Sequence, residues 1–193
     1  MTRIGLFQGL SSEQRRMLER VAALLSGRGV DAGVVAESDR GTVWERHVLD
    51  SLRAVAALGP GDRTAYDLGS GAGLPGIPIA IACPDLHVGL VESQRRRVAW
   101  LELIVDELAL PNAAVIHRRI EAIERSADVC FARALAAPGR SWELARPLLR
   151  PGGRLVYFAG SSLDRDRTAA IVPVIRFVEP ALDSSGPLVI IGE

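Results

Sequence analysis

A glycine-rich turn between a predicted buried strand and a predicted helix limits the possible folds of this chain more than any other feature. The turn lies in residues 66–76, where Gly69, Gly71 and Gly73 follow Asp67 at the end of an apolar run. Glycine has no Cβ, so the backbone can bend sharply and still approach a ligand closely. The helix that follows offers unpaired N–H groups and the positive end of its dipole. We therefore predict that a nucleotide-type cofactor binds at this turn.

The pattern after residue 62 alternates between strand and helix, which is typical of a parallel sheet with helices on both faces. We predict strands at residues 64–68, 87–91 (closing on Glu92), 113–116, 128–131 and 154–158, with a closing hairpin from 172–178 and 188–191. Helices are expected from Pro75 to just before Pro84 and at residues 95–108, 141–149 and 164–170, with a turn at 150–153. Residues 62–193 should thus form an α/β, doubly wound, mainly parallel seven-stranded domain.

Residues 1–61 are expected to form an N-terminal helical extension that makes one compact unit with this domain. Ser11 and Gln14 have the spacing of a capping box at the start of a first helix. That helix is expected to break at three glycines, Gly27, Gly29 and Gly33. A second helix is predicted from Thr42, with Glu45 three residues on, to about residue 58.

Composition favours an ordinary globular protein without a metal centre. The chain has 23 basic and 23 acidic residues, so no net positive charge indicates nucleic-acid binding. Its two cysteines, Cys83 and Cys130, are too few for a disulfide framework or a zinc cluster and are expected to be buried structural thiols. We see neither a leader pattern nor an apolar stretch of membrane length, so a cytoplasmic protein without a membrane partner is expected.

The glycines formally match G-x-G-x-x-G at residues 71–76, and Glu92 follows at a suitable distance for a ribose contact, so a nicotinamide or flavin cofactor is one interpretation. Three features favour S-adenosylmethionine instead. A carboxylate at Asp67 would repel a pyrophosphate but suits the cationic amino group of S-adenosylmethionine. The turn is longer than the dinucleotide one. The helix–turn–strand unit at residues 147–155 looks like that of class I methyltransferases.

Strand ends in a doubly wound sheet converge on one crevice, so Asp67, Glu92 and Arg133 are expected to face it. Glu92 can accept hydrogen bonds from a ribose diol; the alternative is a solvated acid. Arg133 can stack on or hydrogen-bond a guanine through its planar fork. Its alternative role is an ion pair with an acid such as Glu121 or Asp128.

Other polar and aromatic residues have more ordinary interpretations. His47 is expected to act with Asp50 in fixing the N-terminal helix over the glycine turn. Trp44 and Trp100 lie at helical spacing among apolar residues and are predicted to belong to the core. A local basic rim suited to RNA backbone contacts, or simply a solvated face, is expected from five arginines, Arg95, Arg96, Arg97, Arg118 and Arg119.

Together these residues resemble one family, the bacterial 16S ribosomal RNA guanine-N7 methyltransferases once called glucose-inhibited division protein B. The matching segments span about residues 43–160 and comprise residues 46–51, 67–78, 96–98, 100–101, 119–121 and 133–134. The resemblance implies a class I S-adenosylmethionine-dependent methyltransferase fold (Rossmann-like) with an N-terminal helical extension. It also implies S-adenosylmethionine as the methyl donor and N7 of a guanine in 16S rRNA, free or in a small-subunit assembly intermediate, as the acceptor.

The resemblance also assigns roles to individual residues. It places the cofactor at Asp67, Gly69, Gly71, Gly73, Glu92, Ser93, Ile120, Glu121 and Arg133. Arg133 is further implied as the catalytic residue, where the methyl group and the target base meet. Arg96 and Arg119 are implied to face RNA. Guanine N7 already carries a lone pair, so no general base is expected.

The chain departs from the family pattern at three places. The usual lysine after the fifth strand is Ala159, residues 34–37 replace an asparagine-rich segment, and Gly186 lies where a basic residue is usual. These differences motivate a rival, a diverged methyltransferase of the same fold acting on another RNA or a small molecule. A nicotinamide-dependent oxidoreductase and a non-catalytic S-adenosylmethionine-binding module are further alternatives.

Overall fold

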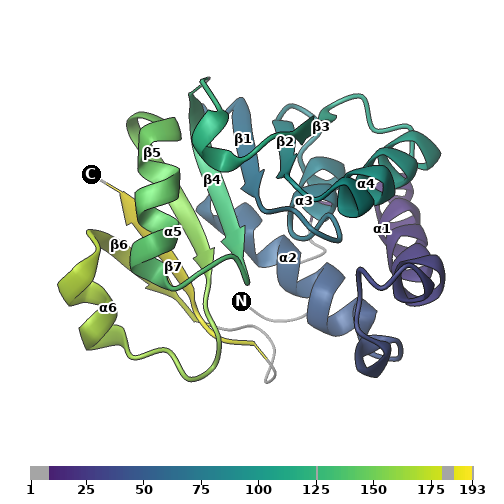
Figure 1. Cartoon of the computed structure of the whole chain (residues 1–193), viewed down its shortest axis with the longest axis horizontal. Coiled ribbons are helices and arrows are strands. Elements are labelled where there is room, and N and C mark those ends of the chain that lie inside the picture. The colour runs from purple at the N-terminus through teal and green to yellow at the C-terminus, as the bar shows by residue number, and fades with distance from the viewer. Residues whose placement is uncertain (1–8, 125, 180–184, 193) are drawn as a thin grey trace.

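The computed structural model describes residues 9–124, 126–179 and 185–192 and contains a seven-stranded sheet in the order β3-β2-β1-β4-β5-β7-β6 (Figure 1). The strands are β1 (Thr64–Leu68), β2 (His87–Glu92), β3 (Ala113–His117), β4 (Ala127–Arg133), β5 (Leu149–Phe158), β6 (Val174–Val178) and β7 (Leu188–Gly192). Strands β1 to β5 pair in parallel, whereas β7 runs antiparallel to both β5 and β6. The predicted parallel sheet and its closing hairpin are therefore confirmed.

Helices cover both faces of the sheet, as the alternating sequence pattern predicted (Figure 1). They are α1 (Ser12–Leu24), α2 (Asp50–Leu52), α3 (Gly76–Ala82), α4 (Arg95–Glu107), α5 (Pro138–Ala145) and α6 (Arg165–Ile171). Successive residues of a strand point to opposite faces. On β4, Val129 and Phe131 therefore join the core under α1 to α4, while Cys130 and Ala132 join the core under α5.

The first helix extends further than predicted. After α1 the chain continues in a π-helix, η2 (Leu25–Gly29), and leaves the helical conformation only near Gly33, whose φ is +64°. The prediction that Gly27 and Gly29 break this helix is wrong, because a glycine inside a helix costs only about 1 kcal/mol, which packing outweighs. The Ser11–Gln14 capping box is confirmed.

The second helical segment ends close to the predicted residue, but its start differs from the prediction. It consists of a π-helix, η4 (Trp44–Leu49), then α2, then a 3-10 helix, η5 (Arg53–Ala57). Thr42 does not cap it, since its hydroxyl donates to the Asp39 carbonyl at 3.2 Å. Trp44 is half-buried against the core and Trp100 is buried, so both core predictions hold in substance.

The boundary before β5 differs from the prediction. The helix expected at residues 141–149 begins earlier, at Pro138, and ends at Ala145, followed by a 3-10 turn, η7 (Arg146–Leu148). Strand β5 already begins at Leu149, which pairs with Ala127, and the pairing register shifts before Arg154 meets Val129. The Pro-Gly-Gly segment expected as a separate turn thus lies within an irregular start of β5.

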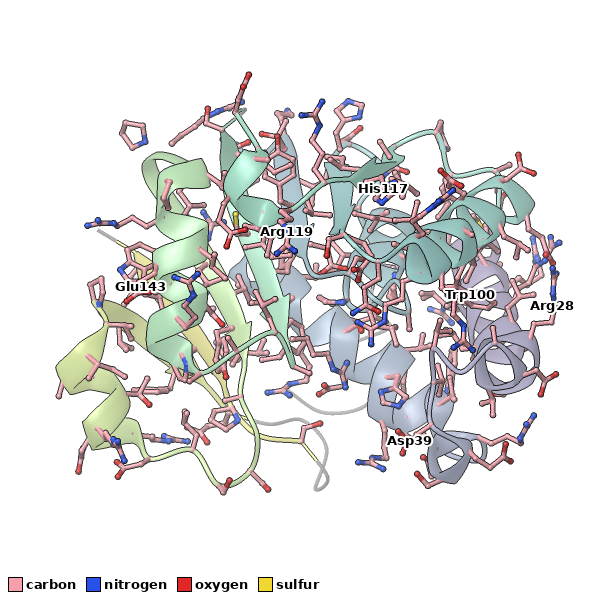
Figure 2. All side chains as sticks on the ribbon, in the orientation of Figure 1. Arg28, Asp39, Trp100, His117, Arg119 and Glu143 are labelled. Atoms are coloured by element: carbon pink, nitrogen blue, oxygen red, sulfur yellow. The ribbon has the colours of Figure 1, made fainter. Side chains whose placement is uncertain are left out.

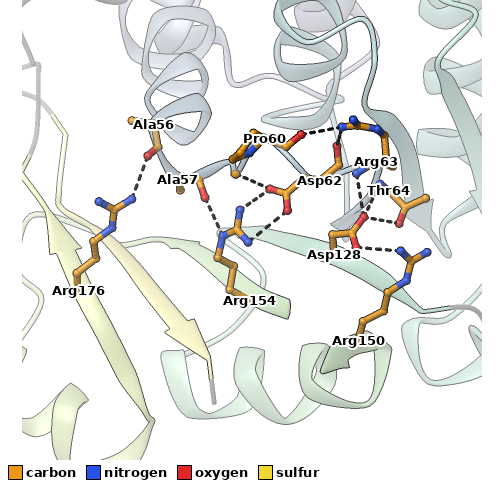
Figure 3. A network of polar contacts seen from close by, with 11 residues as sticks. Ala56, Ala57, Pro60, Asp62, Arg63, Thr64, Asp128, Arg150, Arg154 and Arg176 are labelled. Carbon is orange, nitrogen blue, oxygen red and sulfur yellow. Dashed lines mark hydrogen bonds and ion pairs between the residues drawn. The ribbon is translucent and has the colours of Figure 1, made fainter. Parts of the chain in front are cut away.

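Polar contacts join the end of the N-terminal extension to the sheet (Figure 3). The Arg154 Nε donates to the Ala57 carbonyl at 2.7 Å, and its guanidinium pairs with Asp62. Arg176 on β6 donates to the Ala56 carbonyl at 3.0 Å. The carbonyls at the end of η5 are therefore bound by arginines of β5 and β6.

Among the described residues, the helices are too short or too polar to cross a membrane.

Candidate functional site

The strand order changes direction between β1 and β4, and this reversal places a crevice at the carboxyl ends of these strands. From β1 the chain proceeds outward through β2 to β3, and from β4 it proceeds to β5 on the other side. Loops that leave adjacent strands in opposite directions open such a crevice, where doubly wound sheets bind their ligands. The predicted site residues follow β1, β2, β3 and β4 at this same edge.

A cleft of about 230 Å³ lies at this edge. Six of the residues expected around a cofactor or at its rim line it: Gly69, Glu92, Ser93, Arg119, Ile120 and Glu121. Val91, Gln94, Arg97, Arg118, Ala134 and Leu135 complete the lining. Arg119 is labelled in Figure 2, on the segment between β3 and β4. The fold therefore gathers residues from four separate strand ends into one site.

Glu92, at the end of β2, is buried rather than solvated, with 4% of its surface exposed. Its Oε1 accepts the N–H groups of Ser93 and Gln94 at 2.7 and 2.9 Å. Its Oε2 accepts the N–H of Gly71 at 3.1 Å and lies 3.9 Å from the Arg97 guanidinium. A carboxylate has about four acceptor positions. Glu92 therefore retains capacity for a hydroxyl group and also ties β2 to the glycine turn.

Asp67, at the end of β1, lies behind the glycine turn instead of lining the cleft. It is 1% exposed, and its Oδ2 accepts the Ser70 hydroxyl at 2.6 Å and the Gly76 N–H at 3.0 Å. Burial raises the pKa of Asp67 to about 6, although the Ser70 and Gly76 bonds and the Arg133 charge oppose the shift. Asp67 thus organises the turn and satisfies the first N–H group of α3.

The three glycines after Asp67 all have positive φ, at +68° for Gly69, +58° for Gly71 and +91° for Gly73. L-residues with side chains rarely adopt this left-handed conformation. A Cβ on Gly73 would also lie 2.3 Å from the Ile77 side chain, so the turn packs directly on α3. The predicted sharp turn is confirmed, and its backbone conformation requires glycine.

Arg133, at the end of β4, spans from the sheet to the second helical segment. Its Nη2 donates to the Arg46 carbonyl at 2.7 Å and lies 3.2 Å from the Asp50 carboxylate. The guanidinium also lies over the Phe158 ring, 5.6 Å from its centroid. Burial lowers the pKa of Arg133, and the Asp50 charge opposes that shift.

The two acids considered as alternative ion-pair partners of Arg133 pair with other arginines instead. Glu121 lies 3.5 Å from Arg140, and Asp128 lies 2.9 Å from Arg150. The carboxylate that Arg133 does meet, Asp50, is also bound by Arg53 at 2.6 Å. Arg133 therefore forms an ion pair with an acid of the N-terminal extension, 83 positions earlier in the chain.

His47 pairs with Asp39 rather than with Asp50. Its Nε2 lies 3.1 Å from the Asp39 carboxylate, and its Nδ1 lies 3.3 Å from the Arg133 Nη2. A guanidinium can only donate, so Nδ1 accepts and Nε2 carries the proton. Burial and the Arg133 charge lower the pKa of His47, which favours this neutral form. His47 thus links the extension to β4.

The predicted basic rim is only partly directed at the cleft. Arg97, Arg118 and Arg119 line it, whereas Arg96 donates to the Ala32 carbonyl in the extension. The structure thus gives Arg96 an intramolecular partner that the prediction of an RNA-facing residue did not include.

Several residues that shape this site were missed from the sequence. Ser70 and Gly76 bind Asp67, Asp39 binds His47, and Arg53 binds Asp50. Trp100, whose position is labelled in Figure 2, donates from its Nε1 to the Ala72 carbonyl of the glycine turn at 3.2 Å. Ser70 and Arg53 could have been found locally, because each follows the acid that it binds by three residues.

A larger hollow of about 610 Å³ lies near the start of β1, β2 and β3, away from the crevice. Its ionisable lining residues, His87, Glu124 and Arg150, are all exposed. It lacks the buried acid and the glycine turn that distinguish the cleft at the carboxyl ends.

Among the described residues, no group of three or more histidine, cysteine or acidic side chains could hold a metal ion.

Solved structures with this fold include methyltransferases. A TehB-like S-adenosylmethionine-dependent methyltransferase from Corynebacterium glutamicum superposes with a TM-score of 0.61 at 12% identity, covering 86% of this chain and 99% of that one. An S-adenosylmethionine-dependent O-methyltransferase from Thermotoga maritima gives 0.56 at 17% identity, covering 73% and 63%. At these identities the likeness shows the fold, a class I Rossmann-like methyltransferase fold.

Sequence comparison is more specific. Proteins named ribosomal RNA small subunit methyltransferase G are 40% identical over 162 residues in a Nocardioides species and 41% identical over 149 residues in Mycobacterium leprae. The aligned regions cover 83% and 74% of this chain but only 64% and 59% of those relatives. The relative in Clavibacter michiganensis subsp. michiganensis is 41% identical over 150 residues, which cover 77% of this chain and 70% of that one.

A family model agrees with these pairwise comparisons. The model described as rRNA small subunit methyltransferase G matches residues 14–170. That match runs from α1 to α6 and includes every residue of the cleft. The chain belongs to the rRNA small subunit methyltransferase G family.

Proposed function

We propose that this protein transfers a methyl group from S-adenosylmethionine to N7 of a guanine in 16S rRNA. The observation that carries the proposal is membership of the rRNA small subunit methyltransferase G family together with the cleft at the carboxyl ends of the strands. The chain spans about 60% of the length of the first relatives, so their whole activity comes to it as a proposal. Such a substrate would place the reaction in the cytoplasm.

The residues in the cleft fit this donor. The free acceptor capacity of the buried Glu92 suits a ribose hydroxyl, and Ile120 offers an apolar wall for a purine ring. Ser93 and Glu121 lie beside them in the lining. Gly69 allows close approach of the backbone, and Gly71 and Gly73 shape the rest of the turn. Asp67 supplies negative charge behind it for the cationic amino group.

A nicotinamide dinucleotide fits less well. In that class of site the pyrophosphate binds at the N-terminus of the helix after the glycine turn. Here the N–H of Gly76, the first residue of α3, donates to the Asp67 carboxylate at 3.0 Å. A pyrophosphate at this position would lose that donor and meet a buried acid. The carboxylate therefore favours a cationic ligand at this turn.

The chemistry asks little of the protein beyond alignment. When bound, S-adenosylmethionine supplies an activated methyl group on sulfur that an attacking lone pair can displace in line. Guanine N7 has such a lone pair, and holding reactants in an aligned geometry accounts for a large part of such catalysis. The fixed glycine turn, Asp67 and Glu92 would hold the donor in one orientation. No proton has to be removed from the acceptor atom.

For the acceptor side we propose the end of β4. Arg133 lies there as the candidate catalytic residue, next to Ala134 in the cleft lining. Its guanidinium bonds the Arg46 carbonyl and Asp50, so contact with a guanine would replace or share one of these bonds. Arg119, exposed at the rim, is proposed to contact the RNA backbone, and the exposed Arg96 is proposed to extend this surface.

A second candidate acceptor follows from the ends of β5 and β7. Ala159 replaces the usual lysine, and a Cβ on Gly186 would lie 2.3 Å from the Ala159 carbonyl oxygen, so these two segments are in close contact. The nearby Arg53 donates to the Gly186 carbonyl at 2.8 Å and is 2% exposed, so it does not present a surface charge in place of the lysine. This observation favours a related methyltransferase with another RNA or a small molecule as acceptor.

The deciding experiment is incorporation of labelled methyl groups into naked 16S rRNA and into assembled small subunits, followed by mapping of the modified base. We expect one modified guanine, with the methyl group on N7. Binding of S-adenosylhomocysteine and of NAD is measured by calorimetry in parallel. Binding of NAD alone would contradict the donor proposal. Binding of S-adenosylhomocysteine without transfer to either RNA would support a different acceptor or a non-catalytic binding module.

A further inference from the structure

Trp100 connects the N-terminal extension to the glycine turn. We propose that Trp100 is a positioning residue through which the packing of Gly29 in the extension sets the affinity of the glycine turn for the methyl donor. The inference rests on the proposed donor, S-adenosylmethionine. It assigns a role in donor binding to a tryptophan and a helical glycine outside the lining of the cleft.

The indole of Trp100 contacts both partners directly. On one side its Nε1 donates to the Ala72 carbonyl at 3.2 Å, in the middle of the glycine turn. On the other side its ring packs on Gly29 of η2, where a Cβ would lie 3.3 Å from Cζ2 and 3.4 Å from Cη2. Trp100 is 6% exposed, so the ring is enclosed between the two segments. Movement of either segment must displace the ring or open a gap.

A second contact from the same helix holds this part of the extension. Arg96 precedes Trp100 by four residues, so both lie on one face of α4. Its guanidinium donates to the Ala32 carbonyl and would lie 2.8 Å from a Cβ on Gly33. Two side chains of α4 therefore contact the turn that ends the first helical segment. Of these two, Trp100 also contacts the glycine turn.

The hydrogen bond to Ala72 acts on atoms next to the donor-binding groups. Ala72 follows Gly71, whose N–H donates to Glu92 at 3.1 Å. A shift of the Ala72 carbonyl rotates the peptide groups around it and changes the orientation of that N–H toward Glu92. Since Glu92 is proposed to bind the ribose, the position of the Trp100 ring sets the geometry of the proposed donor site.

Two glycines of the same π-helix provide a matched test. Gly29→Ala places a methyl group against the Trp100 ring, whereas a Cβ on Gly27 meets nothing within 4 Å. Both substitutions change helix propensity equally, so their difference isolates the ring contact. With the full chain and S-adenosylhomocysteine in calorimetry, we expect Gly29→Ala to weaken binding about 5-fold, since a net hydrogen bond is about 1 kcal/mol, and Gly27→Ala to leave it unchanged.

Trp100→Phe removes the N–H donor and the outer ring atoms while keeping an aromatic core residue. We expect it to weaken S-adenosylhomocysteine binding about 3- to 10-fold, the equivalent of one hydrogen bond. Trp142→Phe, on α5 in the other core, is the control and should bind as the unaltered protein does. In Trp100→Phe, the added change Gly29→Ala should have no further effect, because the clashing ring atoms are absent.

A spectroscopic readout separates positioning from general destabilisation. In the variant Trp44→Phe with Trp142→Phe, Trp100 is the only tryptophan, and its emission should change when S-adenosylhomocysteine binds. If the unaltered protein fails to bind S-adenosylhomocysteine, the proposed donor is wrong and this inference falls with it. If the unaltered protein binds but Trp100→Phe and Gly29→Ala bind equally well, the inference alone is overturned. An unchanged emission of Trp100 on binding overturns it as well.

Discussion

The two ends of the site are held together by opposite kinds of contact. On the proposed donor side, around the glycine turn, carboxylates accept backbone N–H groups: Asp67 binds Gly76, and Glu92 binds Gly71 and Ser93. On the proposed acceptor side, arginine side chains of the strand ends and helices bind carbonyls and one buried acid. There Arg133 and Arg53 both reach Asp50.

This difference predicts which parts of the site tolerate amino-acid substitution. A backbone N–H is present whatever the side chain, so the donor side depends on two acids and on glycine geometry. The acceptor side depends on side chains that reach distant segments, as where Arg53 donates to the Gly186 carbonyl, 133 positions away. Loss of the buried Asp50 there is expected to act through the fold, whereas substitutions on the donor side should act through binding.

The largest expected effect is on stability, from Asp50→Ala. Asp50 is 6% exposed and accepts bonds from Arg53 and Ser185 at 2.6 and 2.5 Å. Its removal leaves two largely buried guanidinium groups without their carboxylate, so the free energy of unfolding should fall by about 3–5 kcal/mol. Denaturant unfolding measures this. Asp31→Ala, whose acid is exposed and pairs with Arg40, should change it by less than about 0.5 kcal/mol. Equal losses in both variants would contradict the importance of the buried network.

The next largest effect is on donor binding, from Asp67→Asn. The asparagine carbonyl can still accept from Ser70 and Gly76, so thermal unfolding should change little. Loss of the negative charge should weaken S-adenosylhomocysteine binding about 10- to 100-fold, the range for two unit charges about 6–12 Å apart at an effective dielectric constant of about 20. Calorimetry measures the affinity, with the exposed Asp85→Asn as control. Unchanged binding by Asp67→Asn would limit this acid to shaping the turn.

A smaller effect is expected for Arg133→Ala, which tests where the two sides meet. Asp50 keeps Arg53 and Ser185 as partners, so the fold should persist. Methyl transfer should slow about 10-fold because the acceptor loses alignment, with donor affinity affected less. Turnover and S-adenosylhomocysteine binding are compared with those of Arg20→Ala, an exposed arginine on α1. Unchanged turnover would show that Arg133 is not at the acceptor.

The smallest effect is a pH dependence that originates from Asp67, whose pKa is raised to about 6 in the folded protein from an ordinary value of 3.8. The proposed donor binds the ionised form, so donor affinity should rise with pH, being about twofold lower at pH 6 than at pH 8. Asp67→Asn should lose this dependence. Calorimetry across this pH range makes the test, and an identical pH dependence in the variant would exclude Asp67 as its origin.

The raised pKa of Asp67 also makes the stability of the protein depend on pH, in the direction opposite to that of donor affinity. The folded state holds the Asp67 proton more tightly than the unfolded chain does. The contribution of this group is therefore fully present below about pH 4 and is lost as pH rises through about 6. The difference in unfolding free energy between the protein and Asp67→Asn should follow this course.

Much of the donor side was predictable because it is encoded locally. Asp67, the three glycines and Glu92 lie at strand ends, where the periodicity of the chain already places them on one edge of the sheet. The helix boundaries were less predictable. Gly29 was expected to break its helix, but it lies within one because the Trp100 ring packs against it.

The acceptor side shows where local patterns stop. His47 was expected to act with Asp50, three positions away on the same segment, but it pairs with Asp39 from the preceding turn. Arg133 was considered with Glu121 and Asp128, yet its partners are Asp50 and the Arg46 carbonyl, 87 positions away. Side chains as long as arginine can reach several acids, and only the packing of whole elements selects one.

Local sequence patterns specify the layered sheet, the position of the crevice and the acids and glycines at its edge. These features follow from periodicity and from backbone conformations that only glycine adopts readily, both of which are properties of neighbouring residues. The packing of whole elements selects which carboxylate pairs with which arginine and which ring contacts the glycine turn. Those pairings join segments far apart in the chain, and their free energy depends on burial, which arises only when the elements pack together.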